Sequence, residues 1–464
     1  MIEEIGLKTN NTKNVLTVIT AAFMSFVGIL TETSLNVIFP TLMKEFKVSL
    51  DVIQWTTTGY LLAISIVMIS SSYLNRRFTA KQLFMTACIG FMTGSLISAF
   101  APNFELLLAG RLISALGVGI SGPLMFNLIV EILPRSKWGF YMGIAGLVIA
   151  MAPTLGPAFG GAVNYYLNWR LIFIIVTIFD LIVFLIGIFV FGKYHEQEKI
   201  GFDWLNYLIL SVALITLTIG INQISKGLSN YKLWLLLLVS AALFYLFIKN
   251  SKRSKKSLID LSVFKNKAFV FGLIAYFLLQ LINIGTSFVL PNYVQIVDKQ
   301  SSLIGGLILL PGSIISGLLN PYFGRLYDKF GAKLPLYLGG TIFALGTFLF
   351  AILGLKLTAI MIIFLYGVLM LGHKMSFSNT MAEALKVQDD TLRSDATAVC
   401  QTGQQLAGSV GTTILAAIIS IWQNKGGASY AYLTAQGSQV AFYFTFVLSI
   451  VIILCDWRMF KLEK

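Results

Sequence analysis

Long apolar runs separated by short polar segments form the main pattern of this chain. A helix that crosses the hydrocarbon core of a bilayer needs about 20 mostly apolar residues. The pattern therefore predicts fourteen spanning helices joined by short loops. They are expected near 15–40, 50–74, 82–101, 104–128, 139–165, 170–192, 204–224, 232–249, 268–291, 301–323, 334–354, 357–378, 395–422 and 438–458, the run at 395–422 being the most polar.

The composition supports the same class of protein. Hydrophobic residues make up 57% of the 464 residues and charged residues 12%, against about 45–50% and about 25% in soluble domains. The mean hydropathy is +0.82. These few charged residues cannot cover the surface of a soluble protein of this length. We therefore expect an all-α membrane protein whose surface is largely covered by lipid.

The positions of the charges orient the predicted helices. The net charge of +14 could indicate a nucleic-acid partner, but the basic residues fall in short loops between apolar runs. Most of the 34 lysines and arginines occupy alternate loops, such as those holding Arg76 and Arg325. Because basic loops stay on the cytoplasmic side, both termini are expected in the cytoplasm, with no nucleic acid bound. The basic segment 250–267 is expected to be a solvated linker, with binding to anionic lipid as the alternative.

Residues suited to catalysis or metal binding are scarce. The chain has two histidines, His195 and His373, and three cysteines without the spacing of a metal site or a disulfide framework. No segment resembles a phosphate-binding loop for ATP. We therefore expect no enzyme activity, no catalytic residue, no metal and no cofactor. His373, beside Lys374, is predicted to mark the inner end of the helix at 357–378.

Two polar segments in distant parts of the chain resemble each other. SYLNRRFTAK at 72–81 and GRLYDKFGAK at 324–333 share a leucine, a phenylalanine and the final lysine at equivalent positions. Internal repeats are common in transporters, and the separation of these two suits six spans plus an extra pair. We therefore predict two six-helix bundles with two additional helices between them. The expected units are an N-terminal bundle at 1–192, the additional helices and flanking loop at 193–249, a basic cytoplasmic linker at 250–267 and a C-terminal bundle at 268–464.

Several motifs resemble one known family. GRLYDKFGAK is similar to the signature loop of the major facilitator superfamily, and APTLGPAFGG at 152–161 is similar to its antiporter motif, which ends in G-P-x-x-G-G. QWTTTGYLLA, which begins at Gln54, resembles the W-x-x-T-x-Y-x-L segment of the fourteen-span drug:proton antiporter branch. The resemblance extends over essentially the whole chain. It implies a multidrug efflux protein of the bacterial plasma membrane.

The resemblance also implies roles for two groups of residues. In the antiporters the span-five motif is expected to seal the interface between the halves, and the signature loop to control gating. The antiporter motif residues are Pro153, Gly156, Pro157, Gly160 and Gly161, and the gating-loop residues are Gly324, Asp328, Lys329 and Gly331. The first loop departs from the signature because Ser72, Arg76 and Thr79 replace its Gly, Asp and Gly, so gating at that loop is in doubt.

Two ionisable residues inside predicted spans could couple transport to protons. Glu32 stands one position after the place where the family usually has an aspartate, and Arg111 keeps the arginine of the family's span-four motif. Both are expected about 12 Å from the outer ends of their helices, at about 1.5 Å per residue. Burial favours the neutral form of a carboxyl group and a nearby guanidinium favours the charged form. A change in their separation would therefore load and release a proton; the alternative is a permanent ion pair that fixes two helices.

Other polar residues inside spans are candidates with alternatives left open. Asp180, near the middle of its span, could bind a second proton or a cationic substrate, or could be a helix-packing contact. Gln280 and Asn283 share one helix face at i, i+3 spacing. For the substrate candidates, a polar contact between helices is as plausible as substrate binding. The substrate candidates are Gln54, Trp55, Thr58, Tyr60, Gln280 and Asn283.

These observations predict a proton-coupled antiporter that exports structurally varied hydrophobic or cationic drugs by alternating access. We expect a monomer in the lipid bilayer, with protons as the coupling ion and sodium as an open alternative. Two other functions compete with this interpretation. One is a dedicated exporter of a single metabolite or lipid on the same fold, and the other is a membrane sensor that transports nothing.

Overall fold

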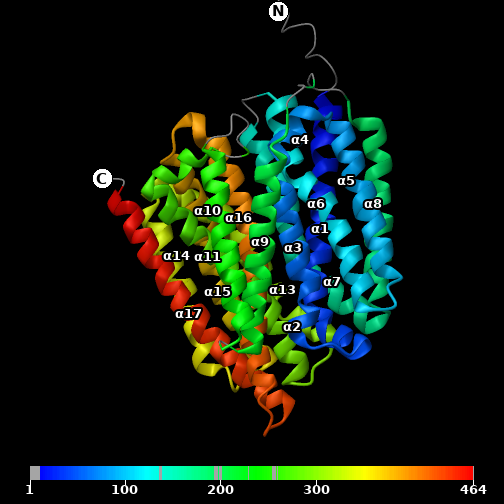
Figure 1. Cartoon of the computed structure of the whole chain (residues 1–464), viewed down its shortest axis with the longest axis vertical. Helices are drawn as coiled ribbons and strands as arrows, with labels where there is room; N and C mark the ends of the chain where they lie inside the picture. Colours follow the sequence, from blue (N-terminus) through cyan, green and yellow to red (C-terminus); the bar gives the residue numbers. More distant parts are fainter. Residues whose placement is uncertain are drawn as a thin grey trace, which may run out of the picture.

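The computed structural model describes residues 11–134, 138–192, 197, 201–227, 229–252, 258 and 260–462. These residues form α-helices with short connections and no strand (Figure 1). His195 and parts of the basic segment 250–267 lie outside them.

The first helices are α1 (Asn11–Phe46), α2 (Leu50–Ile53), α3 (Trp55–Ile69), α4 (Ser71–Arg77), α5 (Ala80–Ala99), α6 (Phe104–Ile132), α7 (Trp138–Tyr166) and α8 (Arg170–Val190). The rest are α9 (Trp204–Asn222), α10 (Tyr231–Ser251), α11 (Lys267–Ile296), α12 (Ser302–Leu307), α13 (Leu310–Phe330), α14 (Lys333–Leu353), α15 (Ala359–Lys386), α16 (Arg393–Gln423) and α17 (Tyr430–Leu462), with 3₁₀ turns at Gln223–Lys226, Leu261–Lys265 and Asp390–Leu392.

The predicted number of spans is confirmed. Within the described ranges, 14 helical stretches are long and apolar enough to cross a membrane. Two of them are interrupted helices: α2 with α3, and α12 with α13. Several helices extend beyond the predicted apolar runs; α15, for example, continues to Lys386 rather than ending near residue 378. Hydropathy measures how much of a helix is apolar, and these helices continue as polar turns past that point.

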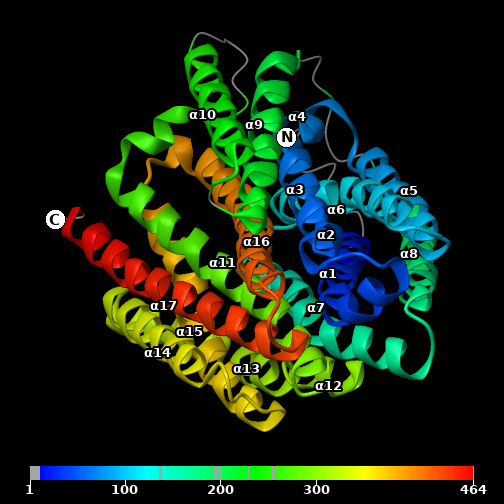
Figure 2. The same ribbon diagram turned by 60° about the horizontal axis from the view of Figure 1, so that its bottom comes forward.

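The first six spans pack mainly on one another, as do the last six (Figures 1 and 2). In the N-terminal half, α1 lies against α6, α7 and α8; in the C-terminal half, α11 lies against α15, α16 and α17. Most contacts between the halves come from three pairs of helices: α3 with α16, α7 with α12, and α1 with α11. Smaller contacts join α7 with α13, α2 with α16 and α1 with α12. There are therefore two long seams, one along α3 and α16 and one along α7 and the α12–α13 span.

The two additional helices, α9 and α10, pack on each other, and α9 also contacts α3 and α16. Figure 2 shows the green pair beside that seam. Ile209 and Leu210 of α9 and Phe247 of α10 share an apolar cluster with Leu62 of α3, against which Leu406 of α16 packs. The pair thus covers the α3–α16 seam. The unit boundaries at 192, 249 and 267 stay a prediction, because most of 193–200 and 253–259 lies outside the described residues.

The halves are joined near one end of the helices. We call this the Glu45 end, where α1 terminates, and the opposite one the Lys81 end, where α5 begins. Asn292 Nδ2 donates to the Asn36 carbonyl at 3.1 Å, and Gln295 Nε2 donates to the carbonyl of Val37 at 2.6 Å. Among the described residues, the hydrogen bonds between the two bundles lie between the Glu45 end and the middle of the helices. The protein is therefore closed at the Glu45 end.

The α7 seam is tight at the Glu45 end and looser towards the Lys81 end. Ser302 Oγ donates to the Gly161 carbonyl at 3.1 Å, and a Cβ on Gly306 would lie 2.1 Å from the Pro157 carbonyl. Farther along the same helices, a Cβ on Gly146 of α7 or on Gly317 of α13 would meet no heavy atom within 4 Å. The contact of α7 with this span is concentrated in α12, since the helices separate beyond it.

Candidate functional site

Arg111 of α6 is enclosed between α1 and α3 in the N-terminal half. Its side chain is fully buried, and its guanidinium carbon lies 3.6 Å from the centre of the Tyr60 ring. Nε donates to the Thr56 carbonyl at 3.3 Å, and the Tyr60 hydroxyl donates to the Gly28 carbonyl at 3.1 Å. A cation over an aromatic face is attracted by the ring quadrupole. Arg111 and Tyr60 therefore link three helices.

Glu32 of α1 lies close enough to Arg111 for an electrostatic interaction. Its side chain is 4% exposed. Neither terminal nitrogen of Arg111 has a hydrogen-bond partner among the described residues. The structure thus brings the two predicted residues together without a direct ion pair. A buried cation with unused donors and a buried carboxyl group are free to change their contact, which a fixed ion pair is not.

Asp180 of α8 lies apart from this group. It is fully buried beside Cys88 of α5, and the Cys88 thiol contacts the Met24 sulfur at 3.7 Å. Neither carboxyl oxygen makes a hydrogen bond of standard geometry with a described residue, although the Cys88 thiol is close enough to interact with the carboxyl group. Neither Glu32 nor Arg111 interacts with it. A proton site, a cation site and a helix-packing contact therefore all stay predictions for Asp180.

Gln54 and Thr58 lie in the α3–α16 seam. Both are fully buried, and the Thr58 hydroxyl donates to the side chain of Gln54. That hydroxyl also lies 2.9 Å from the Thr412 hydroxyl and 3.0 Å from that of Thr413, and Ser409 Oγ donates to the Thr58 carbonyl at 3.1 Å. In this conformation Thr58 ties the halves together and Gln54 is bonded to it, so a substrate could reach them only after the halves separate.

The remaining substrate candidates lie in three places. Trp55 is half-buried at the start of α3, and Tyr60 contacts Arg111 rather than the mouth of a cavity. Gln280 is 7% exposed on α11. Asn283 is half-buried on the same helix, and its carbonyl oxygen lacks a partner among the described residues. The candidate set is thus divided between the two halves.

The antiporter motif lies where α7 packs most closely on α1 and α12. A Cβ on Gly156 would lie 1.9 Å from Thr33 Oγ1, and a Cβ on Gly160 would lie 2.4 Å from the Ser34 carbonyl oxygen. A Cβ on Gly161 would lie 2.4 Å from the Ser302 carbonyl oxygen. Only glycine permits such close approach of backbones. Pro153 and Pro157 lie within the same helix.

The segment predicted as a gating loop is largely helical. Gly324, Asp328 and Lys329 belong to α13, which ends at Phe330 because Gly331 adopts a φ of 75°. The expectation of a loop was wrong because a polar sequence at the end of a span can remain helical. Asp328 and Lys329 are exposed.

Glu383 of α15 is the acid that engages the end of α13. The Tyr327 hydroxyl donates to its carboxylate, and Lys386 Nζ lies 3.1 Å from Glu383 Oε1. Sequence reasoning missed Glu383 because its partner is distant in the chain. The gating role of the segment stays a prediction.

Three ionisable residues in the C-terminal half differ from expectation or were missed. His373 is 2% exposed in the middle of α15, where its ring lies 4.9 Å from that of Phe377; the expected position at a helix end was therefore wrong. Lys374 lies beside it within the span. Asp456 of α17 is fully buried, and neither carboxyl oxygen has a partner among the described residues.

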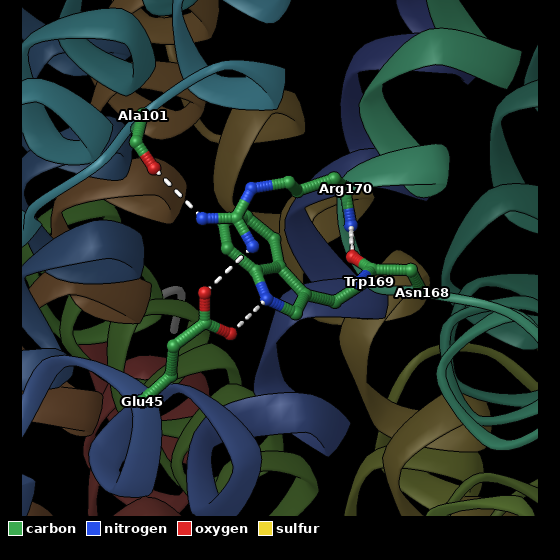
Figure 3. A network of polar contacts seen from close by, with 5 residues as sticks. All are labelled: Glu45, Ala101, Asn168, Trp169 and Arg170. Atoms are coloured by element: carbon green, nitrogen blue, oxygen red, sulfur yellow. Dashed lines mark hydrogen bonds and ion pairs between the residues drawn. The ribbon is translucent and has the colours of Figure 1, made fainter.

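A polar network fixes the N-terminal half at the Glu45 end (Figure 3). Trp169 Nε1 and an Arg170 guanidinium nitrogen each donate to the Glu45 carboxylate at 2.6 Å. A second Arg170 nitrogen donates to the Ala101 carbonyl at 3.0 Å. The network joins the end of α1, the start of α8 and the α5–α6 connection. Next to it, between the halves, is a cavity of about 410 Å³ lined by Pro40, Thr41, Lys44, Glu45, Gln295 and Gln300.

Comparisons with known proteins agree with this architecture. Residues 21–412 match the family model of the Major Facilitator Superfamily. The chain is 33% identical to the lincomycin resistance protein LmrB of Bacillus subtilis, over 97% of each chain. It is 27% identical to the riboflavin transporter RibZ of Clostridioides difficile, over 66% of this chain and 67% of that one.

Among solved structures, the fold resembles a bacterial homolog of the human lysosomal transporter Spinster in an inward-facing, unoccupied conformation. The TM-score is 0.70 with 12% sequence identity, over 98% of this chain and 99% of that one. At this identity the likeness concerns the fold alone. The conclusion on the family rests on the match of the family model to residues 21–412, on the relatives and on the fourteen apolar helices of the described chain. This chain belongs to the major facilitator superfamily and is a multi-pass membrane transporter of small molecules, not an enzyme.

Proposed function

We propose that this protein is a proton-coupled antiporter that exports structurally varied hydrophobic or cationic drugs across the bacterial plasma membrane. The observation that carries the proposal is the placement of Glu32 beside Arg111, whose terminal nitrogens lack hydrogen-bond partners among the described residues. The relative named for lincomycin resistance supports a drug as the exported molecule. Both termini and the Lys81 end are proposed to face the cytoplasm, as the basic loops predict.

In this orientation the structure corresponds to a state that is closed towards the outside. The halves are joined at the Glu45 end, which faces outward, through bonds such as that of Asn292 with Asn36. Export then requires these bonds to break while the halves approach each other at the Lys81 end.

Glu32 and Arg111 act as the proton site in this mechanism. A charged Glu32 attracts the guanidinium and draws on its unused donors, whereas a protonated Glu32 leaves Arg111 held by Tyr60 and Thr56 alone. The two arrangements place α1 differently against α3 and α6. Because coupling is reciprocal, a proton at Glu32 lowers the affinity for substrate by the factor by which substrate lowers the affinity for the proton.

A second candidate function is export of a single metabolite on the same fold. The similarity to a riboflavin transporter favours it. Membership of a transporter family stands against the alternative of a sensor that transports nothing. A panel of chemically unrelated compounds separates the two transport functions, since a dedicated exporter moves one of them or none.

The test uses purified full-length protein in liposomes with an imposed pH gradient. Ethidium, a quinolone and a quaternary ammonium dye are supplied in turn to the wild type, to Glu32→Gln and to a control, Glu105→Gln, whose glutamate is exposed. We expect the wild type and the control to exchange protons for at least two compounds, and Glu32→Gln to bind them without exchange. The proposal fails if none moves, or if Glu32→Gln exchanges as well as the wild type. A sodium gradient at constant pH decides the coupling ion.

A further inference from the structure

One face of α1 carries both the proposed proton site and a contact with the other half. Glu32 and Asn36 are four residues apart on this helix, so they are neighbours on the same face, one turn from each other. Both residues are buried. The Asn36 carbonyl accepts from Asn292 Nδ2 of α11 at 3.1 Å. A movement of α1 at Glu32 therefore also acts on a hydrogen bond between the halves.

Three consecutive threonines of α3 contact three different partners beside this face. The Thr56 carbonyl accepts from Arg111 Nε at 3.3 Å. The Thr57 hydroxyl donates to Asn36 Oδ1 at 2.8 Å, and the Thr58 hydroxyl contacts hydroxyls of α16 in the other half. All three threonines are fully buried. One turn of α3 thus contacts the proton site, α1 and the C-terminal half.

The hydroxyl of Thr57 joins two helices instead of bonding within its own. A serine or threonine hydroxyl inside a helix often donates to a carbonyl one turn back in the same helix, as Ser65 of α3 does to Leu61 at 2.9 Å. Thr57 donates to the Asn36 side chain of α1 instead. Because an unpaired buried acceptor is costly, this bond fixes Asn36 against α3.

The electrostatic surroundings of Glu32 are simple. Among the described residues, the charged or titratable groups that interact with it are Arg111 of α6 and Tyr60 of α3. No such group on the other helices that pack against α1 interacts with it within the described chain. The ionisation of Glu32 therefore acts chiefly on Arg111, which lies on the Tyr60 ring and donates to the Thr56 carbonyl.

The arrangement of Arg111 in this structure is the one expected when Glu32 is neutral. Its guanidinium is held by Tyr60 and by the Thr56 carbonyl, while its terminal nitrogens have no hydrogen-bond partner among the described residues. In the same structure the Glu45 end is closed. A charged Glu32 would draw the guanidinium away from the Thr56 carbonyl. Protonation therefore favours a closed Glu45 end, and deprotonation favours its opening.

We propose that Thr57 is a positioning residue that transmits the state of Glu32 to the contact between the halves through its hydrogen bond to Asn36. With this bond, α1 and α3 respond together, so a shift at Glu32 disturbs the contacts that Asn36 and Thr58 make with the other half. Without it, α1 shifts at Glu32 while α3 keeps its contacts. This inference rests on the proposed function and adds the route by which its proton site controls closure.

The test measures how far the two halves lie apart at the Glu45 end as the pH changes. Spin labels are attached to Glu105→Cys in the N-terminal half and to Lys356→Cys in the C-terminal half, both at exposed positions of that end. The three native cysteines are buried. Pulsed electron paramagnetic resonance on the purified full-length protein in lipid nanodiscs then gives the ratio of open to closed molecules, without substrate or gradient.

Five variants are compared in this labelled background. Glu32→Gln removes the proton site. Thr57→Val keeps the shape of the side chain without its hydroxyl, Thr57→Ser keeps the hydroxyl, and Asn36→Leu removes the acceptor but retains the main-chain carbonyl that receives Asn292. Ser65→Ala is the matched control, because its buried hydroxyl bonds within α3. Thermal unfolding of each variant checks that the protein is folded.

In the wild type we expect the ratio of open to closed molecules to rise about fivefold from acidic to alkaline pH, a change that one hydrogen bond can produce. Glu32→Gln should stay closed at every pH. Thr57→Val and Asn36→Leu should respond by less than about twofold although Glu32 still titrates in them, because the link is lost. Thr57→Ser and Ser65→Ala should respond as the wild type does.

The proposal is overturned if Thr57→Val responds to pH as strongly as the wild type, if Thr57→Ser does not restore the response, or if Ser65→Ala loses it to the same extent. Failure of the proposed function gives a different result, because Glu32→Gln would then keep the response of the wild type. A wild type that shows no response overturns both.

Discussion

The two ends of α7 show how the same helix can be locked at one end and free at the other. Near the Glu45 end, Gly156, Gly160 and Gly161 bring its backbone against α1 and α12 at distances that leave no room for a Cβ. Near the Lys81 end, a Cβ on Gly146 would meet open space. In this helix glycine therefore permits close packing at one end, whereas at the other end a glycine borders open space.

The other helices repeat this difference. At the Glu45 end, hydrogen bonds cross between the halves, as from Gln295 to Val37. At the Lys81 end there are bonds within a half, such as those from Lys81 to the Ile188 carbonyl and from Asn14 to the Ile132 carbonyl. Between the halves, Asp395 of α16 interacts electrostatically with Arg76 of α4. The halves are thus joined by hydrogen bonds towards the Glu45 end and by a charge interaction at the Lys81 end.

The largest effect is expected when valine replaces glycine at the two ends of α7. Gly160→Val would drive a side chain into the Ser34 backbone and should destabilise the fold by about 3 kcal/mol, at the upper end of overpacking costs. Gly146→Val should cost far less because its side chain enters open space. Thermal unfolding in detergent measures both. Equal losses would show that the two ends do not differ in packing.

Gly161→Val should act on the equilibrium between conformations more than on folding. Its side chain would meet the Ser302 backbone in the other half, so the halves could not close at the Glu45 end. A single cysteine at Gln295, beside the cavity at that end, reports the change through labelling by a membrane-impermeant maleimide. We expect labelling to rise about tenfold or more, which corresponds to about 1.4 kcal/mol. Unchanged labelling would contradict the role assigned to this contact.

Thr58→Val should weaken the same closed state by a smaller amount. The substitution keeps the shape of the side chain but removes a hydroxyl that contacts Thr412 and Thr413. The cost to the closed state is about 1 kcal/mol, seen as increased labelling at position 295. Thr177→Val is the matched control, because that hydroxyl bonds only within its own helix, to the Phe173 carbonyl. A similar rise in labelling for both variants would show that the rise does not come from the α3–α16 seam.

The smallest effect is expected for Glu45→Gln. The side chains of Glu45 and Arg170 are 36% and 30% exposed, and ion pairs this accessible to water contribute about 0–1 kcal/mol. The amide can still accept a hydrogen bond from Trp169. The unfolding temperature should therefore change little and the change should shrink as salt is added. A large, salt-independent loss would mean that the network controls closure rather than the local position of α8.

Much of this architecture could be predicted from the sequence. A run of about 20 apolar residues has few alternatives to a spanning helix, so the number and order of spans followed directly. Depth along two helices was enough to place Glu32 and Arg111 at a common level, and the structure brings them together. The ends of helices could be predicted less well, because α15 and α13 continue as polar turns after their apolar runs stop.

The contacts between distant helices could not be predicted. Nothing local indicates that Tyr60 would cover Arg111, or that Thr58 would meet Thr412 across the halves. Both depend on how helices rotate about their axes, which apolar sequences with weak polar faces leave undetermined. The position of Lys374 was misjudged for a related reason: the sequence places it near a helix end, whereas α15 continues to Lys386.

The pair α9–α10 removes the symmetry between the two seams. The α3–α16 seam is covered along its length by helices that bind to both of its sides, whereas no additional pair packs on α7 and α13 in the described chain. The α7 and α13 helices can therefore separate without displacing an additional pair of helices, whereas separation of α3 from α16 must also displace α9 from one of them. Movement of the two halves is thus hindered more on one flank of the protein than on the other.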